Sequence, residues 1–161
     1  MTAAAGIRVR RARRDDWPSA RALLREIDDL HAAIAPEYFR ATARAEGEWH
    51  HLLDEDATAV LVAEMPAQDG AIAVLVARIY DTPENPAMVP RRRLHVETLV
   101  VASKQRRHGV GRRMMSEAAE WGRSHGAAEL VLTTWVGNRE AAAFYERLGY
   151  RELSRVLTAQ L

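Results

Sequence analysis

The chain has 161 residues, enough for one globular domain with its own core, and we expect a single domain over residues 1–161. It contains no cysteine, which excludes a disulfide scaffold, a thiol nucleophile and cysteine-ligated zinc or iron–sulfur centres. A net charge of +1 gives no global field that would gather nucleic acid. No apolar stretch approaches the about 20 residues that span a bilayer, and the N-terminus is too short for the core of a signal peptide. We therefore expect a cytoplasmic protein with no membrane partner, no nucleic-acid partner and no metal.

The N-terminal part predicts a short strand and two helices. Residues Ile7 to Arg10 suit a strand, and the acids followed by proline from Asp15 to Pro18 are typical of a helix start. Apolar residues then recur with helical spacing, so the first helix runs to about Leu30. Pro36 breaks the chain, and a second helix is expected over Ala41 to Leu53.

Three apolar strands are expected in the middle of the chain. Thr58 to Met65 and Ala71 to Tyr80 are separated by the short turn Ala67 to Gly70, which predicts an antiparallel hairpin. Asp81 to Pro90 contains three prolines and predicts a loop. Leu94 to Val101 forms the third strand, apolar on both faces as in a central strand covered on both sides.

The C-terminal part predicts helix, strand, helix and strand. Gly109 opens a helix that ends at His125 and Gly126, and Glu129 to Trp135 forms the next strand. Asn138 caps a helix that ends at Gly149. Tyr150 to Leu157 then closes the chain as a final strand. The expected order is β-α-α-β-β-β-α-β-α-β.

The segment from Val101 to Arg112 combines a strand end, a tight basic turn and a helix start. Such a turn directs several backbone N–H groups at one place, where the helix dipole also favours negative charge. Gly109 and Gly111 would let the backbone approach a ligand, so the turn suits an anion and best a pyrophosphate. A Walker loop would need a Gly-Lys-Ser/Thr end, and a dinucleotide fingerprint a third glycine where Met114 stands. The alternative is a plain strand-to-helix turn.

Two motifs decide between these alternatives. Val101 followed by Arg106, Gly109 and Gly111 resembles the acetyl-CoA motif of the GNAT superfamily of N-acetyltransferases, Gln/Arg-x-x-Gly-x-Gly/Ala after a strand. The segment Asn138 to Tyr150, with its Phe-Tyr pair and Gly-Tyr end, is similar to the second signature of that family. The resemblance implies an α+β fold, an α/β arrangement of three layers with a mixed, mostly antiparallel central sheet flanked by helices, and acetyl-CoA as cosubstrate.

The same resemblance implies which residues hold acetyl-CoA. Backbone N–H groups from Arg106 to Arg112 would bind the pyrophosphate, and Leu99 to Val101 would hydrogen-bond the pantetheine arm, where the strand splays from its neighbour in the family. Asn138 either contacts the cofactor or only caps its helix. The expected cofactor-binding residues are Leu99, Val100, Val101, Arg106, Arg107, His108, Gly109, Val110, Gly111, Arg112, Asn138 and Tyr145.

Acetyl transfer to an amine needs a base, a stabilised oxyanion and an acid for the thiolate. Glu97 lies four residues before Val101, on the face that Leu99 shares, where many members of the family place a glutamate or histidine. We expect Glu97 to be buried, since burial gives a carboxylate the raised pKa that suits a base. The structural alternative is an ion pair with Arg78 or Arg93. His95 is the second candidate base.

Tyr145 matches the family tyrosine that protonates or orients the sulfur of CoA, although a tyrosine beside Phe144 could also be a core residue. A strand amide, that of Val101 or Leu99, would stabilise the oxyanion.

The amine acceptor is expected where the first two helices join. The expected acceptor-binding residues there are Asp28, Asp29, His31, Glu37 and Tyr38. Acids would suit a cationic amine, and the alternative is a solvated helix face. Tyr150 to Leu161 leaves room for little more than one strand, so Asp81 to Arg93 or a second subunit would have to wall the acceptor cleft; we therefore consider a homodimer.

Two other functions remain open at this stage. The triplet Arg91 to Arg93 and the basic turn could form the patch of a nucleic-acid-binding module, against which the net charge argues. The second is a domain of the same fold that binds acyl-CoA as a sensor without catalysis.

Overall fold

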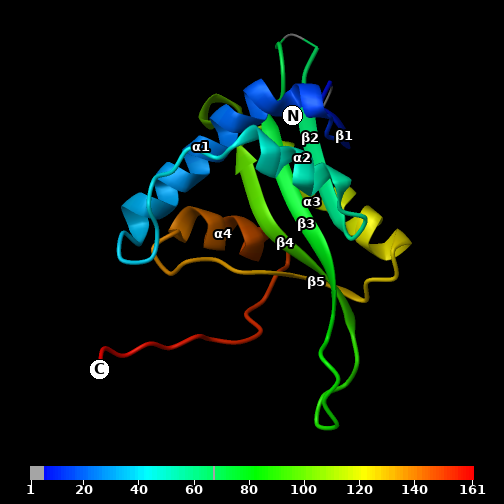
Figure 1. The fold of residues 1–161 in the computed structure, drawn as a ribbon, viewed down its shortest axis with the longest axis vertical. Coiled ribbons are helices and arrows are strands. Elements are labelled where there is room, and N and C mark those ends of the chain that lie inside the picture. Colours follow the sequence, from blue (N-terminus) through cyan, green and yellow to red (C-terminus); the bar gives the residue numbers. More distant parts are fainter. Residues whose placement is uncertain (1–5, 67) are drawn as a thin grey trace.

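The computed structural model describes residues 6–66 and 68–161, so Ala67 in the expected turn and residues 1–5 lie outside the described part (Figure 1). The strands there are β1 (Arg8–Arg11), β2 (Thr58–Glu64), β3 (Ala73–Asp81), β4 (Arg92–Val101) and β5 (Glu129–Leu132). The helices are α1 (Trp17–Ile34), α2 (Glu46–Asp54), α3 (Val110–Ser124) and α4 (Arg139–Arg147), with 3₁₀ turns at Arg14–Asp16 and Ser103–Gln105.

The strands form one sheet in the order β1-β2-β3-β4-β5. Strands β1 to β4 pair antiparallel and β5 pairs parallel with β4, so the sheet is mixed and mostly antiparallel, as predicted. Strands β2 and β3, and then β3 and β4, follow one another without an intervening helix, which allows antiparallel pairing. The crossover through α3 instead brings β5 parallel to β4.

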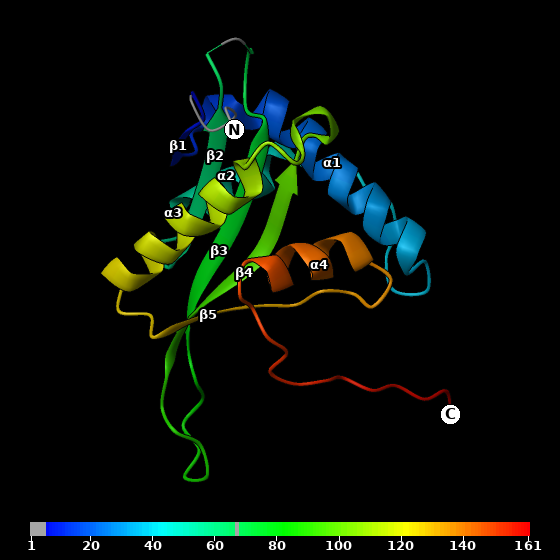
Figure 2. The same ribbon diagram turned by 180° about the vertical axis from the view of Figure 1, so that it is seen from behind.

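Helices cover both faces of the sheet and make three layers (Figures 1 and 2). Alternate strand residues such as Val60, Val62 and Val74 pack under α1 and α2. The residues between them, such as Leu61 and Leu75, pack against α3. Strands β2 and β3 are buried on both faces, which explains their continuous apolar sequence.

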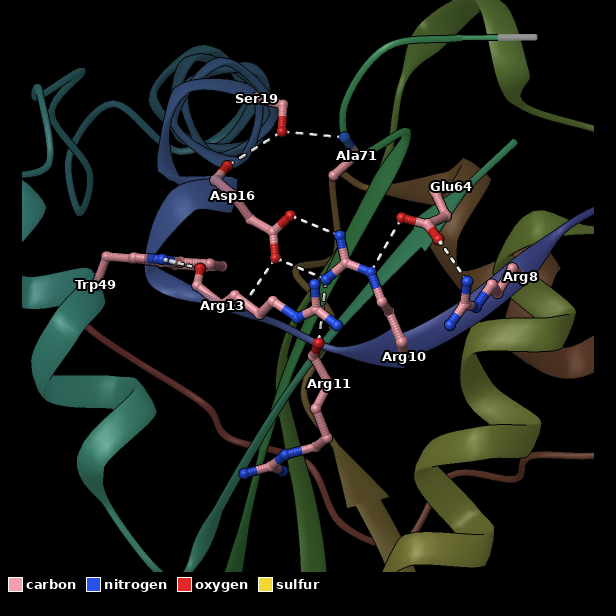
Figure 3. Close-up of polar contacts among 9 residues, drawn as sticks. All are labelled: Arg8, Arg10, Arg11, Arg13, Asp16, Ser19, Trp49, Glu64 and Ala71. Carbon is pink, nitrogen blue, oxygen red and sulfur yellow. Dashed lines mark hydrogen bonds and ion pairs between the residues drawn. The ribbon is translucent and has the colours of Figure 1, made fainter. Parts of the chain in front are cut away.

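An ion-pair cluster fixes the start of α1 against the first two strands (Figure 3). Both terminal nitrogens of Arg10 donate to the Asp16 carboxylate at 2.8 Å, and its Nε donates to Glu64 at 3.0 Å. The Asp16 carboxylate also accepts the Arg13 N–H at 2.7 Å. The Arg10 guanidinium is the main reason why the pKa of Asp16 is lowered.

Most element boundaries fall within a few residues of the predicted ones. Helix α1 continues to Ile34 rather than ending near Leu30, since Pro36 is the first residue that opposes it. Helix α2 begins at Glu46 instead of Ala41, with acids in its first turn. Strand β5 ends at Leu132, before Trp135.

The predicted final strand is wrong. Residues 148–161 contain no strand, and the chain beyond Tyr150 is exposed throughout. It runs away from the sheet and ends far from it in both views (Figures 1 and 2). A strand exists only when a neighbour satisfies its backbone groups, and the described chain offers this segment no neighbour.

Candidate active site

A β-bulge at Glu97 determines which way this side chain faces. Val76 pairs with Thr98, and the next residue of β3, Ala77, pairs with Val96, so Glu97 is an extra residue in β4. An extra residue exchanges the two faces for the rest of the strand.

The exchange corrects the predicted faces of β4. Val96 packs on the α3 side and Val100 on the α1 side, although simple alternation would put them together. Glu97 points to the α1 side, because its carboxylate contacts Arg78 and Tyr80. These two residues lie on the same face of β3 as Val74 and Val76, which pack under α1. It therefore does not share the face of Leu99.

Glu97 is exposed rather than buried, contrary to expectation. Its Oε1 accepts a hydrogen bond from the Tyr80 hydroxyl at 2.9 Å and lies 3.5 Å from the Arg78 Nε. The ion pair that the sequence offered as the structural alternative is thus present. His95 is half-buried, with its ring 6.0 Å from that of Tyr80.

Beyond the bulge, β4 has an edge without a paired strand. The pairing of β4 with β5 ends at Val96 and Leu132. Ala102 donates its N–H to Ile72 beside β3, so the backbone groups of Leu99 and Val101 face away from β3, towards the unpaired edge. Val100 does not fit its predicted contact with the cofactor, because its backbone faces β3 and its side chain is buried under α1.

The turn after β4 carries a run of free backbone donors. In the described part of the chain, none of the N–H groups from Arg107 to Arg112 has an acceptor, and the first helical bond is from Arg113 to Gly109 at 3.0 Å. Arg107 (φ 65°) and Gly109 (φ 84°) both have left-handed backbone conformations. A Cβ at Gly109 would meet open space, so a ligand can approach there.

Gly111 has a different role from the predicted one. A Cβ there would lie 3.0 Å from the Phe144 ring, so the missing side chain lets α4 pack on the start of α3. Its importance is packing between two helices rather than access for a ligand.

The arginines of the turn divide into two groups. Arg106 donates from Nε to the Val101 carbonyl at 3.1 Å and reaches Glu26 of α1 at 3.5 Å, so it braces the turn. Arg107 and Arg112 are exposed, and no acid among residues 6–66 and 68–161 pairs with them. Of the arginines 106, 107 and 112, this second pair offers unpaired positive charge for a phosphate, as does the exposed Lys104.

Helix α4 places Tyr145 against the core. Its ring packs edge-on against Phe144 at 5.0 Å and against Tyr150 at 5.7 Å. Burial, with the neighbouring Tyr150, raises the pKa of Tyr145 to about 12. Asn138 caps the helix by accepting the Ala141 N–H at 3.1 Å.

The acids expected to meet the acceptor are mostly paired. Asp28 holds Arg44 at 2.7 Å, and Asp29 lies 3.7 Å from Arg25. Burial lowers the pKa of His31, with Arg44 adding to the effect and Asp28 opposing it. Exposed Glu37 has no ion-pair partner in the part of the chain that is described.

Aromatic contacts join the α1–α2 connection to the β5–α4 connection. Trp135 contacts the Tyr38 ring at 5.1 Å and the Phe39 ring at 4.8 Å, and Phe39 stacks on His31 at 4.9 Å. The sequence pointed to His31 and Tyr38 but missed Phe39 and Trp135. Phe39 and Trp135 could have been found as aromatic residues in the two connections, one after α1 and one after β5. Trp135 was missed because the predicted strand ran on to include it, whereas β5 ends at Leu132.

The described residues hold no grouping of His, Asp or Glu that could ligate a metal ion. None of the helices in residues 6–66 and 68–161 has the length and apolarity needed to cross a bilayer.

The site is thus an open strand edge that leads into a turn of unpaired N–H groups and a helix start, with a half-buried tyrosine on the neighbouring helix. This chemistry fits a pyrophosphate followed by an extended amide chain, as in CoA. The family model for the acetyltransferase (GNAT) family matches residues 16–150, and the chain belongs to this family. Membership implies acyl transfer from acetyl-CoA.

Two curated relatives agree with the family. The uncharacterized N-acetyltransferase YhfO of Bacillus subtilis is 30% identical over 131 residues, which cover 75% of this chain and 83% of that protein. N-acetyltransferase family 8 member 3 of Rattus norvegicus is 31% identical over 83 residues, covering 52% of this chain but only 33% of the rat protein.

Solved structures share the fold. A variant of the BH1408 protein from Bacillus halodurans superposes with a TM-score of 0.90 at 22% identity, covering 96% of this chain and 99% of that chain. An aminoglycoside N-acetyltransferase in complex with CoA gives a TM-score of 0.72 at 19% identity, covering 96% and 98%.

Proposed function

We propose that the protein moves the acetyl group of acetyl-CoA to a primary amine by direct attack in a ternary complex. The observation that carries the proposal is the run of unpaired N–H groups from Arg107 to Arg112 directly after the open edge of β4. Bound acetyl-CoA would supply the activated acetyl thioester.

The backbone of the turn and two unpaired arginines would bind acetyl-CoA. The N–H groups of the turn would hold the pyrophosphate together with the α3 dipole, and Arg107 and Arg112 would contribute charge to phosphates. The backbone groups of Leu99 and Val101 would bond the amide arm, and one of their N–H groups would stabilise the oxyanion.

Glu97 is the proposed general base. Its carboxylate is accessible to solvent and already accepts one hydrogen bond, from Tyr80, which fixes its orientation. An exposed carboxylate can take the proton of an ammonium through a water molecule, leaving the neutral amine to attack.

Tyr145 is the proposed general acid. A pKa of about 12 keeps its hydroxyl protonated at neutral pH, so it can give a proton to the departing thiolate. A thiol, with a pKa of about 8.5, is the stronger acid, so complete proton transfer from Tyr145 is uphill. The Tyr145 hydroxyl would therefore act chiefly by donating a hydrogen bond that stabilises the departing thiolate, and any proton it gives up would be restored by the proton that the attacking amine releases.

The acceptor is proposed to enter beside His31 near the end of α1 and beside Glu37 and Tyr38 in the connection that follows. Tyr38 packs on Trp135. Asp28 pairs with Arg44 and so holds this connection to α1, whereas Asp29 lies beside Arg25 within α1; both acids are thus already next to a cation. Glu37 and the faces of Tyr38 and Trp135 remain for a cationic amine.

Ligand-dependent thermal stability, followed by thiol release with amines, tests the proposal. Acetyl-CoA should raise the melting temperature and an oligonucleotide should not, and a panel of polyamines, amino acids, peptides and aminoglycosides should contain an amine that releases CoA. Stabilisation without thiol release would instead indicate an acyl-CoA sensor. Stabilisation by the oligonucleotide alone would indicate a nucleic-acid-binding module.

A matched pair of glycine variants locates the cofactor site. Gly109→Ala and Gly126→Ala both put a side chain at positive φ, 84° and 79°, at opposite ends of α3, so each should cost about 1 kcal/mol of stability. Only Gly109→Ala should also weaken acetyl-CoA binding, by about tenfold. Equal affinities in the two variants would place the cofactor elsewhere.

A further inference from the structure

The end of α2 reaches the sheet beside Glu97. Glu55, the residue that follows α2, has its carboxylate next to Arg78 of β3 and next to Thr58 at the start of β2. Thr58 and Arg78 lie directly opposite each other in the pairing of β2 with β3, so one carboxylate can reach both side chains. Arg78 in turn lies beside Glu97. Charged groups from α2, β3 and β4 therefore meet at the proposed base.

Glu55 is held from several sides. Its Oε2 accepts a hydrogen bond from the Thr58 hydroxyl at 2.8 Å and lies 2.8 Å from a terminal nitrogen of Arg78. Its Oε1 lies 3.1 Å from Nε2 of His51, one turn earlier in the chain. Thr58 is completely buried, so its hydroxyl needs this acceptor. The position of the Glu55 carboxylate is therefore well determined.

Arg78 is shared unequally between two acids. Its terminal nitrogen is 2.8 Å from Glu55, whereas its Nε is 3.5 Å from Oε1 of Glu97. That Nε is buried and donates to no acceptor among residues 6–66 and 68–161, and a buried N–H without an acceptor is unfavourable. A guanidinium free to turn would satisfy it by forming two parallel hydrogen bonds with the Glu97 carboxylate. The close ion pair with Glu55 opposes that rotation.

Only one oxygen of Glu97 is engaged. The contacts from Tyr80 and Arg78 are both to Oε1, and Oε2 has no hydrogen-bond or ion-pair partner in the part of the chain that is described. A general base needs an oxygen within reach of the proton that it removes. A bidentate pair with Arg78 would occupy both oxygens. The activity of Glu97 as a base therefore depends on where Arg78 is held.

We propose that Glu55 is a positioning residue, which holds the Arg78 guanidinium off Glu97 and so keeps Oε2 free for the proton of the acceptor's ammonium. The proton moves to Oε2, directly or through water, and the neutral amine attacks the thioester. This inference rests on the proposed role of Glu97 as the base, and it adds to that site a residue from the end of α2.

Turnover of a double variant tests the positioning role. Thiol release is measured with the amine of the panel that releases CoA fastest. Glu55→Ala should lower kcat by about tenfold, because the released Arg78 pairs with Glu97. Arg78→Met removes this competitor, so Glu55→Ala combined with Arg78→Met should have the same kcat as Arg78→Met alone. A tenfold loss that persists when Arg78 is absent would show that Glu55 only supports the fold, and would overturn the proposal.

Two further variants control for folding. Asp54→Ala removes the neighbouring acid, which pairs with Arg14 at 2.7 Å in solvent, and should leave kcat unchanged. Glu55→Gln keeps an acceptor for Thr58 but removes the charge that holds Arg78, so it should lower kcat by about threefold without unfolding. Acetyl-CoA should raise the melting temperature of every variant as it does for the wild type. Wild-type turnover in both Glu55 variants would refute the positioning role.

A crystal structure of Glu55→Ala tests the geometry without any acceptor. The Arg78 guanidinium should donate to both oxygens of Glu97, and a guanidinium that stays in its original place would contradict the proposal. The kinetics also separate this inference from the proposed function. Slow turnover of Glu97→Gln beside normal turnover of Glu55→Ala would reject the positioning role alone. Normal turnover of Glu97→Gln would reject the base itself.

Discussion

Glu97 illustrates how a single extra residue reorients a candidate catalytic group. The bulge turns its carboxylate to the α1 side, where Tyr80 donates to it and Arg78 lies beside it. The sequence identified the residue through its distance from Val101 but gave the wrong face, since alternation assumes an uninterrupted strand. A bulge depends on the partner strand and leaves no local signal in the sequence of β4.

Replacing Glu97 by Gln should lower kcat/KM at neutral pH by about 100-fold, because the amide cannot accept the proton of the ammonium. Acetyl-CoA affinity should be unchanged. Initial rates against pH provide the measurement, and a pH–rate profile of unchanged shape and height would remove Glu97 from the base role.

Glu129→Gln is the matched control for this variant. Glu97 lies in β4 and Glu129 in the neighbouring strand β5. Both side chains are 30% exposed, and each lies beside an arginine. Similar rate losses in the two variants would attribute the effect of Glu97 to its ion pair.

Tyr145→Phe should slow turnover and also change stability at alkaline pH. The pKa of Tyr145 is raised from 10.0 to about 12 in the folded chain. The stability that the protonated hydroxyl contributes to the folded state is therefore fully present below pH 10 and is lost as the pH rises towards 12. At most about 3 kcal/mol is involved. Melting temperatures between pH 9 and pH 12 should fall less in the variant.

Tyr150→Phe serves as the control for Tyr145. Burial raises the pKa of Tyr150 too, but this residue lies outside the proposed proton path. We expect its turnover to match the wild type; if Tyr145→Phe also turns over normally, the role of Tyr145 is packing.

At the scale of elements, helices with a clear apolar stripe were predicted well and segments that depend on tertiary partners were not. Helix α3 buries Val110, Met114 and Ala118 as its spacing indicates. Strand β5 was predicted too long because Thr133 to Trp135 have strand-like residues, yet β4 has already diverged there. The candidate turn was found because glycine spacing is local, whereas the packing role of Gly111 against Phe144 could not be seen in one segment.

The ion pair between Arg10 and Asp16 should be a main support of the N-terminal elements. Asp16→Ala removes a carboxylate that is only 8% exposed and leaves Arg10 without its bidentate partner, which should cost about 3 kcal/mol. The pKa of Asp16 is lowered in the folded chain, so its contribution is present above about pH 4 and is lost as the pH falls further. Urea unfolding at pH 7 and pH 3 should show a smaller difference between variant and wild type at pH 3.

Asp54→Ala tests the same type of bond in solvent. Asp54 pairs with Arg14 at 2.7 Å, but the side chains are 61% and 56% exposed. We expect a loss below about 1 kcal/mol. A loss equal to that of Asp16→Ala would show that burial does not determine the strength of these pairs.

For the whole molecule, the family resemblance carried by the two motifs was sufficient to predict the layers and the mixed sheet. The one large error, the strand from Tyr150 to Leu157, has an informative cause. The alternating pattern of this segment favours an extended conformation, but no strand in the described part of the chain pairs with it. The region proposed for the acceptor was the least predictable, because Trp135 and Phe39 meet only after the whole chain has folded.

The bulge at Glu97 also bears on how the chain can change length during evolution. The path from Glu97 to Gly111 is fixed at both ends. One residue inserted in β4 after the bulge would rotate the backbone groups of Leu99 or Val101 away from the open edge, and one inserted in the turn would displace its unpaired N–H groups. The exposed hairpin tip between Asp81 and Arg92 has no such constraint. Insertions should therefore be tolerated in that hairpin and rejected between positions 97 and 111, a difference that an insertion scan scored for activity would reveal.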